Sequence, residues 1–412
     1  MMHPEDVGMS SERLARVRPT LEKYIADDKV AGIVATIVRR GQVVYEDCLG
    51  LMDRETQTPM RPDAIFRIYS MTKPIICLAL MTLYEQGLFH LNLPVAAFIP
   101  AFNSLKVYAG EDEAGEMILE ELRRPVTIRD LLTHTSGLTY HWLENGRVEQ
   151  LYRDAQLSFE SPLDEFVAEL VKLPLAFQPG TSWRYSLAHD VVAYLVQLIS
   201  GKPVDVYLRE TIFEPLGMVD TGYYVPEAKL DRLVTMYGSV NVLYSDVSIT
   251  RWFGDAMKGA SNYLAGARDS LESAPHQAFR GGHGLVSTAA DYLRFAQMLL
   301  NGGELNGRRI ISRKTLELMT ANHLAPNLLP VELGGVPRPG EGYGLGFGVI
   351  MDIGQYQAVG SVGSFSWGGA ASTTFWVDPQ EELIGVMMSQ YQPPVHLLTP
   401  DFKVMAYQAI AD

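Results

Sequence analysis

The chain has 412 residues, more than one ordinary hydrophobic core accommodates, so two domains are the natural expectation. Hydrophobic residues make up 47% and charged residues 20%, which is usual for a water-soluble globular protein. The net charge of −14 at pH 7 is spread without long acidic runs and argues against nucleic acid or an anionic membrane surface as a partner.

Other classes of protein are disfavoured by what the sequence lacks. The first residues have no apolar core of a secretory signal, and no apolar run is long enough to cross a bilayer, so a cytoplasmic protein is expected. Cys48 and Cys77 fall in a predicted strand and a predicted apolar helix, where buried free thiols are expected instead of disulfides. The nine histidines show no His-x-x-x-His spacing, and no metal or cofactor is expected.

The first 90 residues combine helices with a β-hairpin. Residues 10–28 have the spacing of an amphipathic helix. Two β-rich runs within 31–50 are separated by a turn at Gly41, which predicts a hairpin. A long apolar helix is expected to begin at Ser70 and to end before Gly87, which supplies the stop.

The remainder of the chain divides into a helical and a β-rich part. From about residue 91 to 280, helical segments alternate with loops marked by Pro and Gly, and strand-like runs are scarce. β character then returns, with a second hairpin at the Asp378-Pro379 turn and a last helix near the C-terminus. We therefore expect an α+β fold, in which an antiparallel sheet flanked by helices is built from residues 1–90 and 281–412, with a mostly helical domain, 91–280, inserted.

Three other segments attract attention on composition. The charged segment 103–124 is expected to be a solvated loop with one or two helical turns, and a lid over an active-site cleft is the sharper alternative. The glycine-rich runs at 280–284 and 342–348 lack a following Gly-Lys-Ser/Thr, so a phosphate loop is not expected.

The start of the long helix, "YSMTKP", sets a serine three residues before a lysine. Residues at i and i+3 share one face of a helix, so Ser70 and Lys73 lie within reach of each other. The positive end of the helix dipole and partial burial both favour a neutral amine, which could take the hydroxyl proton and activate the serine without a histidine. The alternative is a capping serine beside a solvated lysine, although Lys73 alone among the lysines follows a serine at this spacing.

Two later segments could complete such a site. Tyr185 lies on a loop just before a predicted helix, where its phenol could relay protons, although a core tyrosine is the simpler interpretation of this residue alone. Trp367, Gly368 and Gly369 stand at the entry to a strand. The glycines would let the backbone approach a bound acyl group, and the amide of Ala370 could then donate to an oxyanion.

Taken in order, these motifs resemble the serine β-lactamase and penicillin-binding protein family. The family pattern is Ser-x-x-Lys, then a tyrosine motif, then a Lys/His/Trp-x-Gly strand, and the resemblance is strongest to the class C-like branch that includes family VIII carboxylesterases and related acyltransferases. It extends from about residue 9 to the C-terminus through the strings RPDAIFRIYSMTKPI, VTIRDLLTHTSGL, FQPGTSWRYS, IFEPLGMVDT, GGHGLVSTAADYLRFAQMLLNGG and YGLGFGV.

The resemblance implies a role for each matched residue. Ser70 would be the acylated nucleophile and Lys73 the base that activates it, while Tyr185 would share the proton and later help to activate water. The amides of Ser70 and Ala370 would form the oxyanion hole. Whether the lysine or the tyrosinate is the base stays open, because the pair would titrate as a coupled unit.

Two departures from the lactamase pattern bear on the substrate. The tyrosine motif of lactamases ends in Asn, but Leu187 stands there, and the strand motif begins with Trp367 instead of lysine. Both changes remove a polar side chain that could bind the substrate. An apolar substrate-binding wall is therefore expected, formed by Leu187, Trp367, Gly368 and Gly369. The resemblance therefore implies a carboxylesterase for neutral short-chain esters, with β-lactam hydrolysis at most a slow side reaction.

Several alternatives remain beside this interpretation. A Ser-His-Asp hydrolase is disfavoured because no Gly-x-Ser-x-Gly occurs, and His134, His189 and His283 are more simply structural. A β-lactamase, a D-amino-acid peptidase or an acyltransferase would use the same acyl-enzyme, although a peptidase would need an anionic or amide anchor that the sequence does not reveal. A non-enzymatic binding protein is disfavoured because the serine, lysine and tyrosine are all present. The expected partner is a small-molecule ester, the oligomeric state is not readable, and the aromatic residues that could wall an acyl pocket are Tyr140, Trp142, Tyr244 and Trp252.

Overall fold

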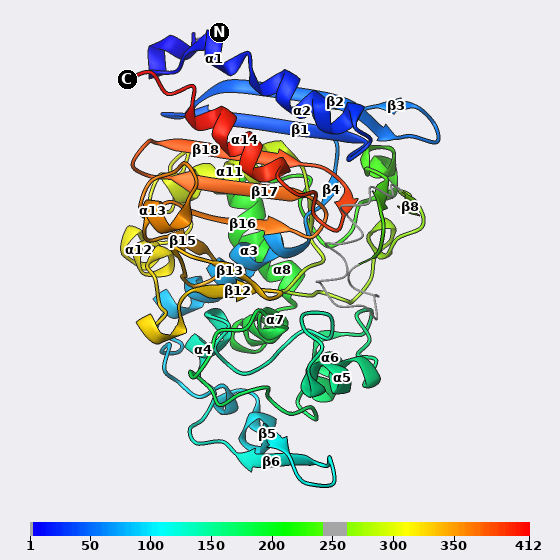
Figure 1. Cartoon of the computed structure of the whole chain (residues 1–412), viewed down its shortest axis with the longest axis vertical. Helices are drawn as coiled ribbons and strands as arrows, with labels where there is room; N and C mark the ends of the chain where they lie inside the picture. The colour runs from blue at the N-terminus through cyan, green and yellow to red at the C-terminus, as the bar shows by residue number, and fades with distance from the viewer. Residues whose placement is uncertain (1–2, 242–261) are drawn as a thin grey trace.

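One sheet organises the fold of the computed structural model, which describes residues 3–241 and 262–412 (Figure 1). Within these residues the sheet has eight strands in the order β14-β15-β16-β17-β18-β1-β2-β3, and each neighbouring pair is antiparallel. The strands are β1 (Gly32–Arg39), β2 (Gln42–Asp53), β3 (Thr58–Pro59), β14 (Glu341–Tyr343), β15 (Gly348–Ile350), β16 (Phe365–Gly369), β17 (Thr373–Asp378) and β18 (Leu383–Met388). The predicted α+β class and its antiparallel sheet are confirmed, as are the hairpins β1–β2 and β17–β18.

Strands from the two ends of the chain meet in the middle of this sheet. Val34 of β1 pairs with Met388 of β18, so segments that are far apart in the sequence lie side by side. The two ends of the chain also lie close together (Figure 1). The N–H of Ala411 donates to the carbonyl oxygen of Gly8 at 2.9 Å.

Helices cover the two faces of the sheet (Figure 1). Ile33 of β1 points into a hydrophobic cluster shared with α2 and α14, whereas its neighbour Val34 points into the cluster that contains α3 and α11. This alternation is the period of two that a strand imposes on its side chains. The helices of this part of the chain are α1 (Ser11–Leu14), α2 (Val17–Ala26), α3 (Thr72–Glu85), α11 (Ala289–Leu300), α12 (Arg313–Thr320), α13 (Ile353–Tyr356) and α14 (Leu398–Tyr407).

α3 is the central helix of the molecule. Its residues from Thr72 to Leu83 are all buried, which explains why its sequence is apolar on every side. The chain leaves the helix through Gly87, whose φ of 73° is a left-handed conformation that favours glycine. The predicted helix and its stop are confirmed, but the α-helix begins at Thr72, because Ser70 lies in a 3-10 turn directly before it.

The middle of the chain is mostly helical but also contains short strands. Its elements are α4 (Ile128–Leu132), α5 (Arg147–Asp154), α6 (Leu163–Leu170), α7 (Ala188–Ser200), α8 (Val204–Leu208), α9 (Glu214–Leu216), β5 (Lys106–Glu111), β6 (Met117–Glu121), β7 (Met236–Gly238) and β8 (Asn262–Ala265). One hydrophobic cluster runs from the sheet through α3 into α4, α6 and α7. The division into domains 1–90 with 281–412 and 91–280 stays a prediction, and any such boundary would cross continuous packing.

Short strands complete the structure around the main sheet. They are β4 (Phe66–Arg67) with β9 (Val286–Ser287), β10 (Glu304–Leu305) with β11 (Arg308–Arg309), β12 (Val331–Leu333) with β13 (Val336–Arg338), and β19 (Tyr391–Gln392) beside β7. Of these, the β12–β13 hairpin is next to the candidate site described below.

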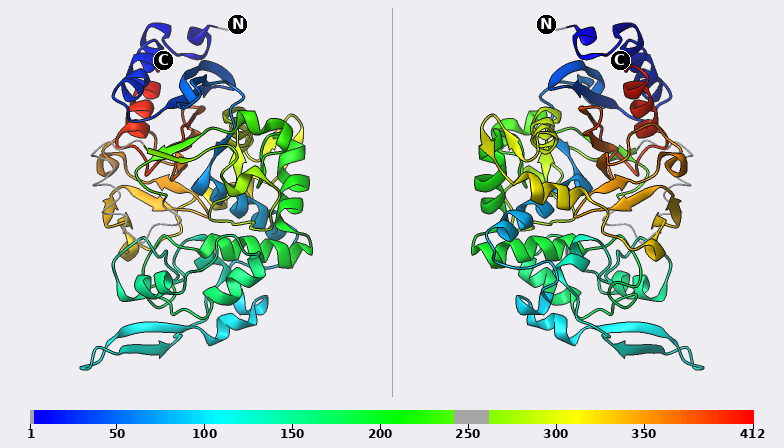
Figure 2. Two further views of the ribbon diagram at one scale, coloured as in Figure 1. Left: turned by 90° about the vertical axis from the view of Figure 1, so that its right-hand side faces the viewer. Right: turned by 90° about the vertical axis from the view of Figure 1, so that its left-hand side faces the viewer.

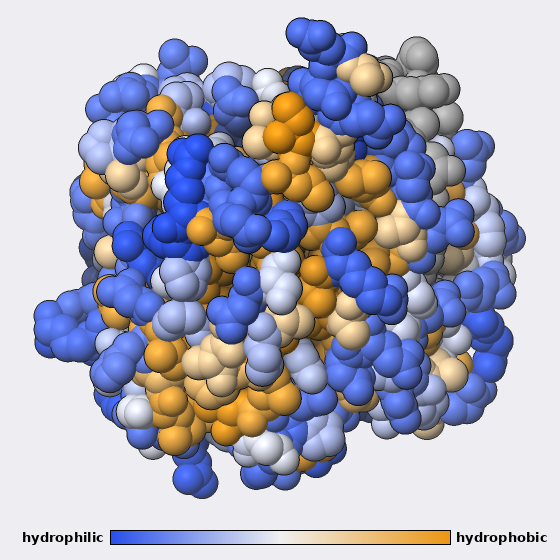
Figure 3. Space-filling view, turned by 90° about the horizontal axis from the view of Figure 1, so that it is seen from below, coloured by the Kyte–Doolittle hydropathy of each residue, from blue (hydrophilic) through white to orange (hydrophobic). Residues whose placement is uncertain are grey.

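The charged segment 103–124 folds differently from the prediction. It forms the antiparallel hairpin β5–β6, which projects from the end of the molecule opposite the chain termini (Figure 2). Val107 is buried at its base, whereas Ile118 and Leu119 are nearly half exposed. The expected helical turns are therefore wrong. Seen from this end, hydrophilic and hydrophobic side chains are interspersed over the surface (Figure 3).

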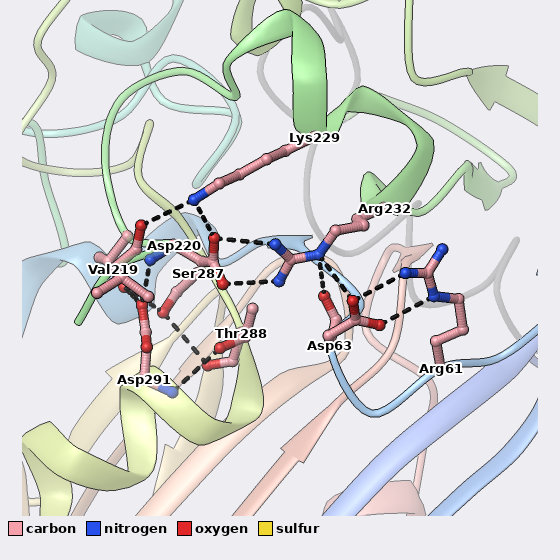
Figure 4. A network of polar contacts seen from close by, with 10 residues as sticks. Arg61, Asp63, Val219, Asp220, Lys229, Arg232, Ser287, Thr288 and Asp291 are labelled. Carbon is pink, nitrogen blue, oxygen red and sulfur yellow. Dashed lines mark hydrogen bonds and ion pairs between the residues drawn. The ribbon is translucent and has the colours of Figure 1, made fainter. Parts of the chain in front are cut away.

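A polar network ties three distant segments together (Figure 4). Asp220 accepts hydrogen bonds from Arg232 at 2.6 and 3.0 Å and from Lys229 at 2.6 Å. Arg232 also pairs with Asp63 near β4, and the N–H of Asp220 donates to Asp291 at the start of α11. The network therefore fastens the segment 219–232 to Asp63, just before β4, and to the first turn of α11.

Among the residues that the structure describes, no single helix has the length and apolar composition to cross a membrane. Two consecutive helical stretches, Ala188–Ser200 and Val204–Leu216, meet that test of length and composition only when taken together, and they are bent by 81°.

Candidate active site

Ser70 lies where the chain enters the central helix. It belongs to the short 3-10 turn η2 (Tyr69–Met71), directly before α3. Tyr69 has a φ of 44°, which is uncommon for a residue with a side chain, so the backbone turns sharply just before the serine. Ser70 is half-buried in the wall of a cavity, while the following turns of the helix run into the core.

Lys73 is fully buried one turn further along, with its amine directed at Ser70. Nζ lies 3.1 Å from Ser70 Oγ, 3.1 Å from Tyr140 Oη and 2.6 Å from the carbonyl oxygen of Gly282. A neutral amine has two N–H donors and one lone pair. When it donates to Gly282 and Tyr140, its lone pair is left for the proton of Ser70. The predicted closeness of Ser70 and Lys73 is confirmed.

The surroundings of Lys73 favour the neutral amine. Burial lowers the pKa of Lys73 from 10.5 to about 7, and the attraction of Asp190 opposes this shift only in part. Asp190 is itself buried, and burial raises the pKa of its carboxyl group. A substantial fraction of the lysine is therefore neutral near pH 7, where a general base is most effective.

Gly282 connects the lysine to this carboxylate. Its N–H donates to Asp190 Oδ1 at 2.9 Å, while its carbonyl oxygen accepts from Lys73. A Cβ atom at this position would lie 2.8 Å from Tyr140 Oη and 2.9 Å from Asp190 Oδ2, so only glycine allows this approach. The glycine-rich run 280–284 thus has a site-building role that sequence reasoning missed, because its partners come from distant segments.

Tyr185 adds a phenol beside the lysine. The centre of its ring is 4.5 Å from Lys73 Nζ, and the indole N–H of Trp367 donates to its hydroxyl oxygen at 3.4 Å. Burial raises the pKa of Tyr185 well above its ordinary value, and hydrogen bonds with Ser70 and Trp367 oppose this shift only in part. Tyr185 is therefore protonated at neutral pH, and the structure brings Ser70, Lys73 and Tyr185 together.

The end of β16 runs directly against the turn that carries the serine. A Cβ atom on Gly369 would lie 2.4 Å from the carbonyl oxygen of Ile68, so glycine is needed for this contact. Ala370 follows, and both Ser70 and Ala370 line the cavity. This arrangement is compatible with an oxyanion hole made from the amides of Ser70 and Ala370.

Ser70 faces a cavity of about 520 Å³, a size suited to a small organic ligand. Aromatic rings, prolines and hydroxyl side chains form most of its walls. The lining residues used below are Ser70, Tyr140, Trp142, Tyr185, His283, Arg338, Glu341, Tyr356, Trp367, Gly368, Gly369 and Ala370. Trp367, Gly368 and Gly369 line the same cavity as Ser70, and their contact with a substrate stays a prediction.

Leu187 does not line this cavity. It is fully buried at the start of α7 and packs in the hydrophobic core. The expectation that Leu187 contacts the substrate is wrong, because the turn after Tyr185 directs the leucine side chain into the core. Tyr140, which the sequence places only in the pocket wall, is hydrogen-bonded to Lys73.

The other candidates are placed as follows. Tyr140 and Trp142 line the cavity as expected, whereas Tyr244 and Trp252 lie outside the described residues. His134 and His189 are buried away from the cavity wall, and burial lowers the pKa of both rings. His283 lines the cavity and is likewise held neutral by burial, which lowers its pKa.

Neither a metal centre nor a lid is found in the described ranges 3–241 and 262–412. These residues contain no group of three or more His, Cys, Asp or Glu side chains arranged to hold a metal ion. Cys48 and Cys77 are free thiols, half-buried and buried. No residue of 103–124 lines the cavity, so the lid alternative is wrong for this structure.

The sheet order, the central helix and the serine-lysine-tyrosine cluster define a β-lactamase/transpeptidase-like fold. The Beta-lactamase family profile matches residues 17–409, and the chain belongs to this family. Protein Rv1367c of Mycobacterium tuberculosis is 33% identical over 387 residues, which cover 93% of this chain and 89% of that protein.

The chain is also similar to an esterase and to a hydrolase of known structure. Esterase EstB of Burkholderia gladioli is 30% identical over 389 residues, which cover 88% of this chain and 87% of that protein. The solved structure of EstCE1, described as a hydrolase with promiscuous acyltransferase activity, superposes with a TM-score of 0.77 at 26% identity and covers 96% of this chain and 99% of its own. These similarities support a serine hydrolase or acyl-transfer activity for the chain.

Proposed function

We propose that this protein is a carboxylesterase that cleaves short-chain esters through an acyl-enzyme on Ser70. The observation that carries the proposal is the set of contacts at Lys73 Nζ, where a buried amine of lowered pKa has its third position occupied by Ser70 Oγ. Such an amine can activate a serine hydroxyl without a histidine. The similarity to Esterase EstB and to the hydrolase EstCE1 supports the same chemistry.

Acylation follows from this geometry. Lys73 takes the proton of Ser70 while Oγ attacks the ester carbonyl carbon, and the developing oxyanion is stabilised by the amides of Ser70 and Ala370. Tyr185, which burial keeps protonated, donates its proton to the departing alkoxide. The proton held by Lys73 then restores Tyr185. These roles make Lys73 the base and Tyr185 the acid of this step.

Deacylation uses the same groups in reverse. Water enters the cavity after the alcohol has left, gives a proton to the tyrosine-lysine pair, and attacks the acyl carbon. Collapse of the second tetrahedral intermediate breaks the bond to Ser70 Oγ, which regains its proton from Lys73. An alcohol or amine could replace the water, and the promiscuous acyltransferase activity of EstCE1 favours acyl transfer as the second candidate function.

The test compares p-nitrophenyl acetate, butyrate and octanoate with the β-lactam nitrocefin, using the unmodified chain and Ser70→Ala. We expect short esters to be cleaved, nitrocefin to lag far behind, and Ser70→Ala to lose at least a thousandfold in kcat, a loss typical for a nucleophile. Fast nitrocefin turnover with weak ester cleavage would make this a β-lactamase. Ester cleavage that survives in Ser70→Ala would overturn the proposed mechanism.

A further inference from the structure

The cavity has a charged patch beside Trp367, made of Arg338 on β13 and Glu341 on β14. Both residues line the cavity. Arg338 Nη1 lies 3.2 and 3.3 Å from the two carboxylate oxygens of Glu341. The side chain of Arg338 is 40% exposed, whereas that of Glu341 is only 9% exposed. The guanidinium is thus the accessible member of the pair.

In the described part of the chain, one nitrogen of the Arg338 guanidinium makes hydrogen bonds to the protein. Within residues 3–241 and 262–412, its hydrogen bonds to protein atoms all come from Nη1. Nε and Nη2 therefore keep their N–H groups for another acceptor. A guanidinium with one free edge is well shaped for a carboxylate, which it can bind through two parallel hydrogen bonds.

Glu341 is fixed firmly enough to aim its partner. Its carboxylate lies against Gly348, where a Cβ atom would come within 2.2 Å of Oε1. Its charge also acts on Lys403 of α14, a buried lysine that donates to the hydroxyl of Tyr356 at 3.5 Å. Glu341 is thus hydrogen-bonded to Arg338 and also attracts Lys403 from a greater distance.

Lys403 does not add a free charge of its own to the cavity. Asp378, which accepts a hydrogen bond from Tyr407, also attracts Lys403. Lys403 donates a hydrogen bond to the hydroxyl oxygen of Tyr356, a residue that lines the cavity. The hydroxyl proton of Tyr356 is therefore available to an acceptor in the cavity.

The charged patch is close to the reacting groups. The guanidinium carbon of Arg338 is 5.9 Å from the centre of the Trp367 ring, and the same indole donates to Tyr185 at 3.4 Å. A ligand that reaches from Ser70 past Trp367 therefore meets Arg338. Of the side chains that line the cavity in the described part of the chain, Arg338 alone carries a permanent positive charge.

We propose that Arg338 is an anion anchor for the substrate, and that the preferred substrates are esters with a carboxylate group a few bonds from the scissile carbonyl. This deepens the proposed esterase function and rests on it. It also changes the expectation of a neutral substrate: the position of Trp367 lacks a lysine, but Arg338 brings a cation to the same wall from a different element.

The experiment uses pairs of esters that differ in one charge. For the acyl side, the pair is mono-p-nitrophenyl adipate and methyl p-nitrophenyl adipate. For the alcohol side, the pair is the butyrate ester of p-hydroxybenzoate and that of methyl p-hydroxybenzoate. In each pair we measure the ratio of kcat/KM for the anionic ester to that for the neutral ester, with the rate in Ser70→Ala subtracted. The pair with the larger ratio shows which side carries the anion.

Two substitutions should move this ratio in opposite directions. Arg338→Gln should lower it about tenfold to a hundredfold, since a hydrogen bond to a charged group is lost, and Arg338→Lys should recover part of it. Glu341→Gln should raise it, because the guanidinium loses its competing carboxylate. The matched control is Arg313→Gln, which removes an exposed arginine paired with Glu317 on α12 and should leave the ratio unchanged.

Binding provides a measurement that does not depend on turnover. The affinity of mono-p-nitrophenyl adipate for Ser70→Ala, measured by calorimetry, should fall at least tenfold when Arg338→Gln is added. An unchanged ratio for both pairs, or an unchanged affinity, would overturn the anion anchor while leaving the esterase intact. Failure of every ester to be cleaved in a Ser70-dependent way would overturn the proposed function, and the binding measurement would still decide on Arg338.

Discussion

Lys73 determines when the proposed nucleophile is active. Only the neutral amine can accept the proton of Ser70, and burial lowers the pKa of Lys73 to about 7. The kcat/KM for p-nitrophenyl butyrate should therefore rise with pH along a limb centred near 7 and level off above it. A solvated lysine would place the same limb above pH 10. A pH-rate profile on a neutral ester distinguishes the two.

A substitution separates charge from proton transfer at this position. Lys73→Arg keeps a cation but cannot release its proton at accessible pH, so a loss of at least a hundredfold in kcat is expected. Lys172→Arg, a change at an exposed lysine paired with Glu169, is the matched control and should leave kcat unaffected. An active Lys73→Arg variant would contradict the assignment of lysine as the base.

The sequence predicts part of this site and misses the rest for physical reasons. Ser70 and Lys73 share one helical turn, so their spacing alone predicts their contact. Tyr185 and Ala370 follow from the order of family motifs. Gly282 and Arg338 have no such local signature, because their partners are brought to them from other segments by the fold. Leu187 is misplaced, because a position in a motif does not say which way its side chain points.

β16 acts as a rigid backbone edge against the serine turn. A Cβ atom on Gly369 would collide with the carbonyl oxygen of Ile68, so Gly369→Ala must push the strand and the turn apart. We expect ester hydrolysis to fall at least tenfold and the free energy of unfolding to drop by about 1–3 kcal/mol, as is usual for overpacking. Kinetics and urea denaturation measure the two effects.

The matched control is Gly222, a half-buried glycine that forms a β-bridge with Val286 and has room around it. At Gly222 the nearest atom to an added Cβ is the carbonyl oxygen of Tyr224 at 3.8 Å, which is ordinary contact. Gly222→Ala should therefore leave both measurements nearly unchanged. Full activity in Gly369→Ala would show that the close approach of β16 is not needed for catalysis.

Helices and strands with a clear hydrophobic pattern are predicted well from the sequence, whereas those that mix charged and apolar residues without a pattern are not. α3 is apolar on every side and ends at a glycine, so its bounds are readable. The bounds of the β5–β6 hairpin are not readable, because charged residues interrupt its two short strands and Val107 is the one buried strand residue. The hairpin is held by pairing between its own strands and by backbone hydrogen bonds of Lys106 and Tyr108 with Leu175, partners that composition does not reveal.

At the scale of the whole molecule, Asp220 holds the segment 219–232 to the sheet part. It is only 12% exposed and faces two cations, Arg232 and Lys229. Asp220→Asn would leave Lys229 without a carboxylate and Arg232 with Asp63 alone. We expect a loss of roughly 1.5–3 kcal/mol in the free energy of unfolding, as for lost hydrogen bonds between charged groups. Asp231→Asn is the control, since Asp231 is 67% exposed in its pair with Arg61 and should cost little.

The stabilisation from the ion pairs of Asp220 with Arg232 and Lys229 depends on pH. Burial tends to raise the pKa of Asp220, but Arg232 and Lys229 outweigh burial and lower it overall. The stabilisation is therefore complete above the unfolded-state pKa near 3.8 and is lost as the pH falls through the lower folded-state value. Asp220→Asn should destabilise the protein less at low pH than at neutral pH. An equal loss at both would contradict an ion-pair origin.

The pairing of β1 with β18 has a consequence for how the protein is made. During synthesis β1 leaves the ribosome long before its partner, so its edge stays uncovered while most of the chain is produced. The serine, lysine and tyrosine also emerge early, but Ala370 and the strands around it come last. A nascent chain therefore carries Ser70, Lys73 and Tyr185 before β16 is made, and the wall of the cavity is complete only when the C-terminal strands join the sheet.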